Sequence, residues 1–244
     1  TLLKVIEMAK SVGLDIMYGD TDSVFVRYEH GKIKELLSRI RKDLSMDVKI
    51  DKIYDRVIFT EAKKRYAGLL PSGKIDVVGM EAVRGDWAGV AKTVQENVLE
   101  LILKDNDERR ALGYLREVLS KVRAKELPLR EFVIWKTLTK PVEEYEARSA
   151  HVEVAKILQQ QGWDLTVGDK VGFEIRKKLG RLFEKAQPYS STRIDDIDLE
   201  YYVKSQIIPA AMRALSVLNV TESQLSFKEK KTFLADFAQE RSLV

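Results

Sequence analysis

The chain has 244 residues and a mass of 28.0 kDa, which is enough for one large domain or two small ones. Hydrophobic residues make up 45% of it, an ordinary globular share that excludes wholesale disorder. The absence of cysteine and the count of two histidines exclude a disulfide scaffold, a thiolate metal site and a His-rich zinc site. We find no apolar run long enough to span a bilayer and no signal-peptide pattern.

Charge is distributed unevenly along the chain. Lys and Arg number 42 against 38 Asp and Glu, a formal net charge of +4. The segment 170–193 carries seven basic and two acidic residues, a net of +5, so the rest of the chain sums to −1. Its basic side chains are Lys170, Arg176, Lys177, Lys178, Arg181, Lys185 and Arg193. Such a stripe suits a polyanionic partner, and it fits a solvated helix face equally well.

The first third of the chain alternates between helix and strand patterns. Apolar periodicity predicts a helix over 1–12, hairpin strands over 16–18 and 23–28, a helix over 33–44, a strand over 48–60, and a second hairpin with strands over 66–70 and 75–80. The second hairpin is indicated by Pro71-Ser72-Gly73 between its two strands.

Beyond Trp87 the periodicity is mainly helical. Helices are predicted over 88–103, 109–124, 129–138, 151–161 and 201–218. Pro209 lies inside the last of these and predicts a kink. Trp87 and Trp135 are expected in the core. The predicted fold class is therefore α+β: an antiparallel β-hairpin and sheet with helices, followed by a mostly helical part.

Two aspartates, Asp20 and Asp22, lie one residue apart in the turn of the first hairpin. Because strand side chains alternate, we expect both carboxylates on the same side. Two anions this close are costly without a cation, and Mg²⁺ binds a few carboxylates together with waters and phosphates. The pair alone is compatible with a magnesium site, with a polar turn, and with the metal-binding Asp-x-Asp of a nucleotide-sugar glycosyltransferase.

The sequence around the aspartates is more specific. Tyr18-Gly19-Asp20-Thr21-Asp22-Ser23, within a hydrophobic hairpin, resembles the active-site hairpin of the family B DNA polymerases. Segments that resemble further motifs of this family follow in the same order: Lys63-Lys64-Arg65-Tyr66-Ala67-Gly68, Gly79-Met80-Glu81 with Arg84-Gly85-Asp86-Trp87, Thr139-Lys140 with Tyr145 and His151-Val152, Gly168-Asp169, and Tyr201-Tyr202 with Gln206-Ile207 and Pro209-Ala210. The resemblance covers roughly residues 1–218, and the ordered series is far more specific than any single motif.

The resemblance implies a DNA-directed DNA polymerase, in which a primer 3′-hydroxyl attacks the α-phosphate of a deoxynucleoside triphosphate (dNTP) with the help of two Mg²⁺ ions. The family pattern makes Asp22 the residue that bridges both ions. It places Asp20 beside the ions and the primer end, so both aspartates are candidate catalytic and metal-binding residues. The residues expected to support this turn are Tyr18, Gly19, Thr21 and Ser23.

The resemblance also implies contacts with primer–template DNA. Lys64 and Tyr66 would touch the primer end and the minor groove, with Lys63 and Arg65 close by, since lysines neutralise phosphates or donate to acceptors shared by all base pairs. Further DNA-binding candidates are Arg84, Thr139, Lys140, Tyr145 and His151. Alternatives remain for two of these sets, because the Lys63–Arg65 run fits a solvated surface and His151 fits an ordinary residue at a helix start.

Two features depart from the family pattern. Arg84 is followed by Gly85 where the family has paired arginines, which puts one contact with the DNA backbone in doubt. Asp47 and Asp51 lie where the family often carries glutamates, and whether either assists the metal site is open.

Other elements of the family are missing from the sequence: the motif that carries the opposing catalytic aspartate, the fingers helix that holds the triphosphate, and the exonuclease motifs. We therefore expect residues 1–66 to form the C-terminal part of a polymerase palm, and residues 67–244 to form a thumb with a C-terminal tail. Activity is expected to need a large polymerase subunit or the remainder of the polymerase chain. The alternative is a non-catalytic DNA-binding accessory subunit.

The tail offers a weaker pattern. Residues 231–237 vaguely resemble a sliding-clamp-binding box, although Lys231 stands where Gln is usual and Ala238 where a second aromatic residue is usual. An amphipathic terminal helix is the alternative. The expected source is archaeal-like, and the expected location is the cytoplasm of a prokaryotic cell, in association with the nucleoid.

Overall fold

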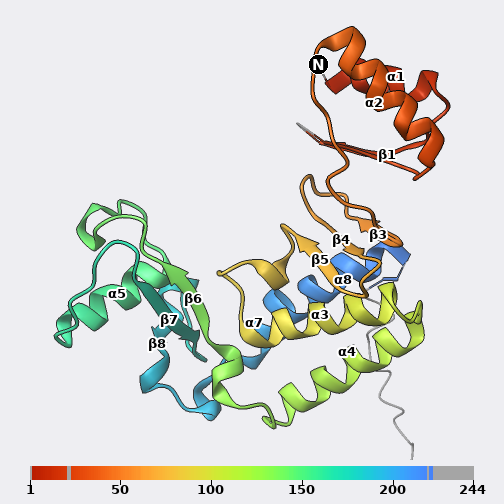
Figure 1. Ribbon diagram of the computed structural model, residues 1–244. Helices are drawn as coiled ribbons and strands as arrows, with labels where there is room; N and C mark the ends of the chain where they lie inside the picture. The colour runs from red at the N-terminus through yellow and green to blue at the C-terminus, as the bar shows by residue number, and fades with distance from the viewer. Residues whose placement is uncertain (1, 21–22, 219, 222–244) are drawn as a thin grey trace, which may run out of the picture.

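The N-terminal residues form a small unit in which two helices pack with a β-hairpin (Figure 1). The computed structural model describes residues 2–20, 23–218, 220 and 221. The elements of this N-terminal unit are α1 (Leu2–Ser11), β1 (Ile16–Asp20), β2 (Ser23–Val26) and α2 (His30–Leu44). Ile33, Leu36 and Ile40 recur at helical spacing along α2 and are buried in the core of the unit. The two predicted helices and the predicted hairpin are confirmed.

Residues 45–55 have no regular structure and lead to a three-stranded antiparallel sheet. Its strands, in spatial order, are β3 (Arg56–Phe59), β4 (Tyr66–Leu69) and β5 (Ile75–Val78). The second predicted hairpin is therefore confirmed. The strand predicted over 48–60 is wrong for residues 48–55, which have no regular structure. Lys52 and Tyr54 instead bind Asp76 of β5 through their side chains, at 2.7 and 2.5 Å.

The main hydrophobic core is built around α3 (Gly89–Leu103), which contacts α4 (Glu108–Arg123), α8 (Ile208–Leu215) and the β3–β4–β5 sheet. Val98 and Leu99 of α3 and Leu115 of α4 have no exposed surface. Both long helices match their predicted spans within two residues, because each presents a continuous apolar stripe to this core.

The predicted helix over 201–218 is present, with a distortion before Pro209. It consists of α7 (Leu199–Tyr202), a π-helical turn (Val203–Ile207), α8 and a final 3₁₀ turn (Ser216–Leu218). Proline lacks the N–H that a regular helix uses to bond the carbonyl four residues earlier. The chain forms a π-helical turn just before Pro209, where this hydrogen bond is missing. The helix is therefore irregular just before Pro209, and the predicted kink stays a prediction.

A second three-stranded antiparallel sheet lies at the other end of the molecule, and we call it the C-terminal sheet. Its strands, in spatial order, are β6 (Ile134–Thr137), β7 (Lys170–Ile175) and β8 (Ala186–Pro188). The helix predicted over 129–138 is wrong, since this segment forms a 3₁₀ turn (Leu129–Phe132) and then β6. Pairing with β7, distant in sequence, overrides the local pattern. The α+β fold class is confirmed.

The remaining elements are one helix and several short turns. The helix α5 (Ala150–Gln160) packs against β7 and β8, as predicted for this span. The short elements are α6 (Leu182–Lys185) and the 3₁₀ turns Glu81–Val83, Val142–Glu144, Tyr189–Ser191 and Ile194–Asp196. No helix in the described part of the chain is long and apolar enough to cross a membrane.

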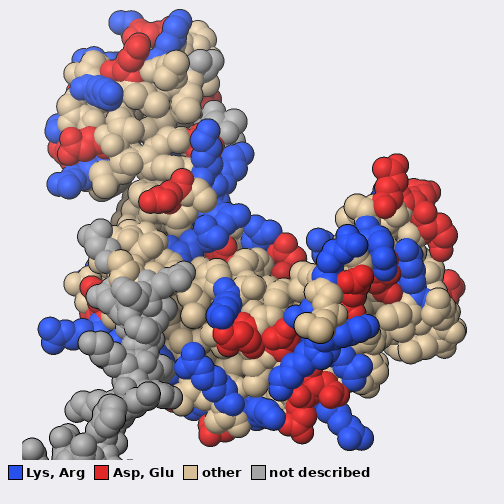
Figure 2. All heavy atoms as spheres, turned by 180° about the vertical axis from the view of Figure 1, so that it is seen from behind, with Lys and Arg blue, Asp and Glu red and all other residues tan. Residues whose placement is uncertain are grey.

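The elements give the molecule an angular shape. In Figure 1 the N-terminal unit stands above the β3–β4–β5 sheet, and the C-terminal sheet with α5 lies to one side of the central helices. Figure 2 shows a broad hollow between the N-terminal unit and the lobe at the far end, with Lys and Arg side chains along the floor and on the lobe's near side. A positively lined hollow of this kind suits a polyanion.

One buried carboxyl in the C-terminal sheet makes stability depend on pH. Glu174 has no exposed surface, and burial raises its pKa to about 7 against weaker opposing effects of Thr192 and Arg176. The folded state therefore holds this proton more tightly than the unfolded chain. The stabilisation that Glu174 contributes to the folded state is complete below pH 4.5, which is the ordinary pKa of this carboxyl in the unfolded chain. It is lost as the pH rises towards 7.

We expect Glu174→Gln, which keeps the shape without the charge, to remove this pH dependence. Between pH 5 and 8 the wild-type free energy of unfolding should fall by roughly 2.5 kcal/mol more than that of the variant. Urea unfolding at the two pH values measures the difference, with Glu146→Gln at an exposed carboxyl as the control. Equal pH dependence in all three proteins would contradict this assignment.

Candidate active-site hairpin and nucleic-acid interface

The candidate catalytic turn closes the hairpin formed by β1 and β2. The strands pair with Tyr18 opposite Phe25, Gly19 opposite Val24 and Asp20 opposite Ser23, with an irregularity between Ile16 and Tyr18. Asp20 is therefore the last residue of β1 and is half-buried. This places its carboxylate at the end of the hairpin, at the mouth of the turn.

The other predicted turn residues, Thr21 and Asp22, lie outside the described residues, so the expectation that the two carboxylates share one side stays a prediction. No group of three or more His, Asp or Glu side chains placed to hold a metal occurs in the described part of the chain. The types of side-chain atom near the hairpin indicate which metal it could bind. The hairpin offers carboxylate oxygens, whereas His30 contacts Tyr28 and His151 is buried beside Ser149. Oxygen-only donors fit Mg²⁺.

Five aromatic side chains join the hairpin to the β3–β4–β5 sheet, and we call them the aromatic cluster: Tyr18, Phe25, Tyr54, Phe59 and Tyr66. Tyr18 stacks on Phe59 with ring centroids 4.9 Å apart, and Phe25 meets Phe59 and Tyr66 edge-on at 5.0 and 5.1 Å. Aromatic pairs in these geometries add to the hydrophobic gain of burial. The cluster therefore fixes the hairpin on the sheet.

The turn between β3 and β4 is bound directly to the hairpin. The backbone N–H of Lys64 donates to the Tyr18 hydroxyl at 3.0 Å, and Lys64 has a positive φ of 60°. Lys63 and Lys64 are exposed on this turn. Thr60 closes its base, because its hydroxyl donates to the Arg65 carbonyl at 3.0 Å. Two exposed cations thus lie on a turn that is fixed to the aspartate-bearing hairpin.

The loop that contains Gly79 packs tightly under the same turn. Gly79 has a positive φ of 64°, and a Cβ added there would lie 2.2 Å from the Lys64 carbonyl oxygen. Only glycine can adopt this conformation at so close an approach. The Gly-Met-Glu segment is thereby placed against the Lys-Lys-x-Tyr segment.

Arg65 points inward to a buried ion-pair network. Its guanidinium lies 3.3 Å from the Glu81 carboxylate, and Arg213 of α8 lies 2.7 Å from the same oxygen. Gln95 of α3 donates to the other Glu81 oxygen at 2.8 Å and to the Ala210 carbonyl at 2.7 Å. Glu81 has no exposed surface, so two guanidinium groups and an amide replace its hydration. The network ties the β3–β4 turn to α3 and α8.

Arg84 is engaged within the protein. Its guanidinium donates two hydrogen bonds to the Asp86 carboxylate, at 3.0 and 2.8 Å. This bidentate ion pair holds the pKa of Asp86 below its ordinary value. Nearby, the buried side chain of Gln206 accepts a hydrogen bond from the Ala88 N–H at 3.0 Å. The predicted DNA contact of Arg84 stays a prediction, and it would compete with this ion pair.

Four other predicted DNA-binding residues lie together beside the C-terminal sheet. The Thr139 N–H donates to the Tyr145 hydroxyl at 2.8 Å, and the Lys140 ammonium lies 5.1 Å from the centre of the Tyr145 ring. His151 meets Tyr145 edge-on at 5.5 Å and is buried, with its Nδ1 3.1 Å from the Ser149 hydroxyl. Burial, with the charge of Lys136, lowers the pKa of His151, which favours its neutral form. His151 therefore positions Tyr145 from within the protein.

The basic segment 170–193 is partly neutralised by the protein itself. Arg176 pairs with Asp196 at 3.1 Å, and Lys185 forms a close ion pair with Asp198. Lys170, Lys178 and Arg193 are exposed. The segment is therefore a mixture of structural ion pairs and outward-facing cations, and it contains β7 and β8 rather than one solvated helix face.

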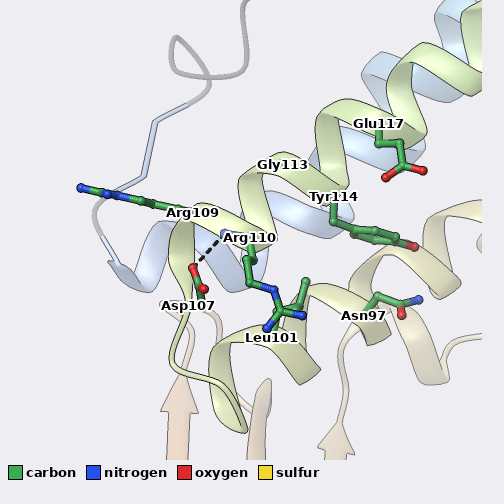
Figure 3. A pocket seen from close by; sticks show the side chains of 8 residues that line it. All are labelled: Asn97, Leu101, Asp107, Arg109, Arg110, Gly113, Tyr114 and Glu117. Carbon is green, nitrogen blue, oxygen red and sulfur yellow. Dashed lines mark hydrogen bonds between the residues drawn. The ribbon is translucent and has the colours of Figure 1, made fainter.

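A hollow lies between the C-terminal half of α3 and the N-terminal half of α4 (Figure 3). Its lining mixes cationic, anionic and neutral side chains, namely Asn97, Leu101, Asp107, Arg109, Arg110, Gly113, Tyr114 and Glu117. The Asp107 carboxylate accepts the Arg110 N–H at 2.9 Å, which caps α4 rather than preparing a ligand site. None of the predicted site residues lines this hollow.

Sequence reasoning missed three residues that position the site: Tyr54, Phe59 and Glu81. Tyr54 and Phe59 complete the aromatic cluster, and the signal for them is one aromatic residue two positions before the short β3 strand and one at its last position. Glu81 was quoted only as part of a motif. Its role depends on Arg65 and Arg213, which are distant in sequence, and local patterns do not reveal such pairs.

Replacing Tyr18 with Phe tests the link between hairpin and turn. The variant keeps the aromatic stack and loses the acceptor for the Lys64 N–H, which should cost about 1 kcal/mol of unfolding free energy. Hydrogen exchange at the Lys64 amide should become faster. Tyr28→Phe, at an exposed tyrosine of the same unit, should leave this amide unchanged. Unchanged exchange in Tyr18→Phe would contradict the link.

Replacing Gly79 with Ala tests the close approach of the two loops. Gly73→Ala is the matched control, because Gly73 also has positive φ but an added Cβ meets nothing within 4 Å. We expect about 1 kcal/mol of destabilisation from the positive φ in both variants, and about 1–3 kcal/mol more at Gly79 from the clash with Lys64. Urea unfolding measures both. Equal losses of unfolding free energy in the two variants would show that the Lys64 carbonyl moves away from the added methyl group at little cost.

The comparisons with known proteins agree with this geometry. A family model for DNA polymerase family B matches residues 2–218. The chain is 44% identical over 232 residues to DNA polymerase 2 of Aeropyrum pernix, covering 95% of this chain and 29% of that protein. It is 35% identical over 239 residues to the DNA polymerase of Archaeoglobus fulgidus, covering 90% of this chain and 30% of that protein.

A solved structure is similar as well. The family B DNA polymerase from the hyperthermophilic archaeon Pyrobaculum calidifontis aligns with a TM-score of 0.66 and 42% identity, covering 90% of this chain and 29% of that one. The chain thus spans about three tenths of the length of these relatives. The resemblance inferred from the ordered motifs is confirmed, and this chain belongs to DNA polymerase family B.

Proposed function

We propose that this chain supplies the C-terminal part of the palm and the thumb of a family B DNA polymerase. In this proposal Asp20 and Asp22 contribute to a two-metal site for nucleotidyl transfer from dNTPs, and the rest of the chain grips the primer–template duplex. The remaining polymerase residues, in one continuous polypeptide or in a separate large subunit, provide the opposing aspartate and the fingers. The expected location is with the nucleoid of a prokaryotic cell.

The observation that carries the proposal is the direct connection between the hairpin and the Lys63–Lys64 turn. Nucleotidyl transfer requires metal-binding carboxylates and the primer end at one place. The Lys64 amide donates to Tyr18, two residues before Asp20, and the aromatic cluster fixes both segments to one sheet. The end of β1, which carries Asp20, and the cations that would hold the primer are therefore set in a common rigid frame.

The metal ions would be held by Asp22 and Asp20 on this chain. When bound, they supply activation of the primer hydroxyl and stabilisation of the leaving pyrophosphate. The chain's own residues would position the reactants: the hairpin presents the Asp20 carboxylate at the end of β1, and Lys63 and Lys64 would neutralise phosphates near the primer end. Two aspartates without the opposing aspartate give an incomplete site, so the isolated chain should be inactive.

Contacts along the duplex are proposed for the C-terminal sheet and its surroundings. Thr139 and Lys140 lie at the end of β6 beside Tyr145, and Lys170 is exposed at the start of β7. Hydroxyl and ammonium groups of this kind bind phosphate oxygens without reading sequence. The predicted clamp-binding segment, residues 231–237, lies outside the described residues and stays a proposal.

Primer extension with Mg²⁺ tests the function. We expect no extension by this chain alone, and extension when it is combined with the remainder of the polymerase. In that assembly Asp22→Asn should lower the single-turnover rate by roughly 100-fold or more. Asp43→Asn, an exposed aspartate on α2 of the same unit, is the control and should leave the rate unchanged.

Two results would contradict the proposal. Efficient extension by the isolated chain would show that the site is complete without a partner. A partner that is active by itself, gains only processivity and is unaffected by Asp22→Asn would make this chain a non-catalytic DNA-binding accessory.

A further inference from the structure

Two large aromatic side chains of the C-terminal sheet are exposed next to each other. The expectation that Trp135 lies in the core is wrong, because 41% of its surface is exposed, and Tyr189 is 43% exposed. Their ring centroids lie 5.3 Å apart with the ring planes tilted by 54°. Trp135 is on β6 and Tyr189 is on the turn after β8, so the fold brings them together from distant segments.

A glycine allows both rings to lie against the sheet. Gly172 of β7 pairs with Trp135 and is buried. A Cβ at Gly172 would lie 2.8 Å from two atoms of the six-membered ring of Trp135 and 2.9 Å from the Tyr189 ring. One side of the indole therefore rests on the backbone of β7, and its exposed surface is on the other side. We call Trp135, Gly172 and Tyr189 the aromatic platform.

The platform lies on the face of the C-terminal sheet that α5 does not cover. Side chains alternate along β7, and Val171, Phe173 and Ile175 are buried in the main core. Gly172 and Lys170 therefore belong to the opposite face. Thr137 pairs with Lys170 and shares this face with Trp135. Both Thr137 and Lys170 are exposed, so a hydroxyl and an ammonium group border the platform.

The charge around the platform favours a polyanion over an acidic or neutral protein surface as its partner. The segment that carries Gly172 and Tyr189 has seven basic and two acidic residues between Lys170 and Arg193; two of the basic ones are paired with Asp196 and Asp198, whereas Lys170, Lys178 and Arg193 are exposed. The two acids are Glu174, which is fully buried, and Glu184, whose carboxylate accepts the Arg181 N–H at 2.6 Å. An apolar ring surface bordered by cations matches the alternation of sugar rings and phosphates along a nucleic-acid strand.

We propose that the aromatic platform packs against deoxyribose rings of the duplex primer–template DNA that this chain grips. The inference rests on the proposed function and deepens it, since it assigns an apolar contact to a surface otherwise expected to act through charge. Such a contact releases no counterions. It should strengthen binding equally at all salt concentrations, whereas each lysine contact contributes to the salt dependence.

Fluorescence anisotropy with a labelled primer–template duplex, measured over a range of salt concentrations, tests this contact in the full chain. We expect Trp135→Ala to raise Kd by about five- to tenfold at each salt concentration, with an unchanged slope of log Kd against log salt. Lys170→Ala should reduce that slope by about 0.9. Trp163→Ala is the matched control, because Trp163 is 57% exposed and lies after α5, away from the platform.

The tryptophans themselves provide a second measurement that does not depend on a truncated side chain. In Trp87→Phe/Trp163→Phe, Trp135 is the sole remaining tryptophan. Addition of duplex DNA should then protect its emission from acrylamide quenching.

Equal Kd values for Trp135→Ala and Trp163→Ala, or unchanged quenching of Trp135, would overturn the platform contact while leaving DNA binding intact. A loss of affinity for single-stranded DNA alone would overturn the duplex contact in favour of base stacking. A wild-type chain that binds no DNA would overturn the proposed function as well.

Discussion

The structure depends on one junction, where the aspartate-bearing hairpin meets the turn between β3 and β4. A two-stranded hairpin is marginal by itself, and this one lies in a small unit with its own core. The stack of Tyr18 on Phe59 and the hydrogen bond from the Lys64 amide fix its orientation relative to the main body. Without this junction, Asp20 and the exposed lysines would have no defined position relative to each other.

From the junction, rigidity continues into the main core through buried polar contacts. Gly79 lets its loop press against the Lys64 carbonyl, and two residues later Glu81 binds Arg65 and Arg213. Gln95 connects the same carboxylate to α8. Removing one partner from such a network leaves a buried charge uncompensated, so each member holds the others in place. The segments that carry the hairpin, Lys-Lys-x-Tyr and Gly-Met-Glu motifs are therefore held in one rigid arrangement, although they are separated in sequence.

Much of this was predictable from sequence, and the exceptions share a cause. The helices α2, α3 and α4 and both hairpins were predicted because their apolar patterns and turn residues are local. The strand β6 was not, because Ile134 and Trp135 are held by β7 rather than by their neighbours in the chain. Glu81 could be quoted from a motif, but its two arginines could not. The DNA-binding roles of Arg65 and Arg84 stay predictions, and both guanidinium groups have acidic partners within the protein.

The central claim is that the hairpin aspartates hold metal beside the primer end in the assembled polymerase. Replacing Mg²⁺ by Fe²⁺ and generating hydroxyl radicals would map that position directly on end-labelled DNA. The account predicts strand cleavage centred on the nucleotides at the primer 3′ terminus, and loss of this cleavage with Asp22→Asn but not with Asp43→Asn. Cleavage spread evenly along the duplex, or unaffected by Asp22→Asn, would contradict it.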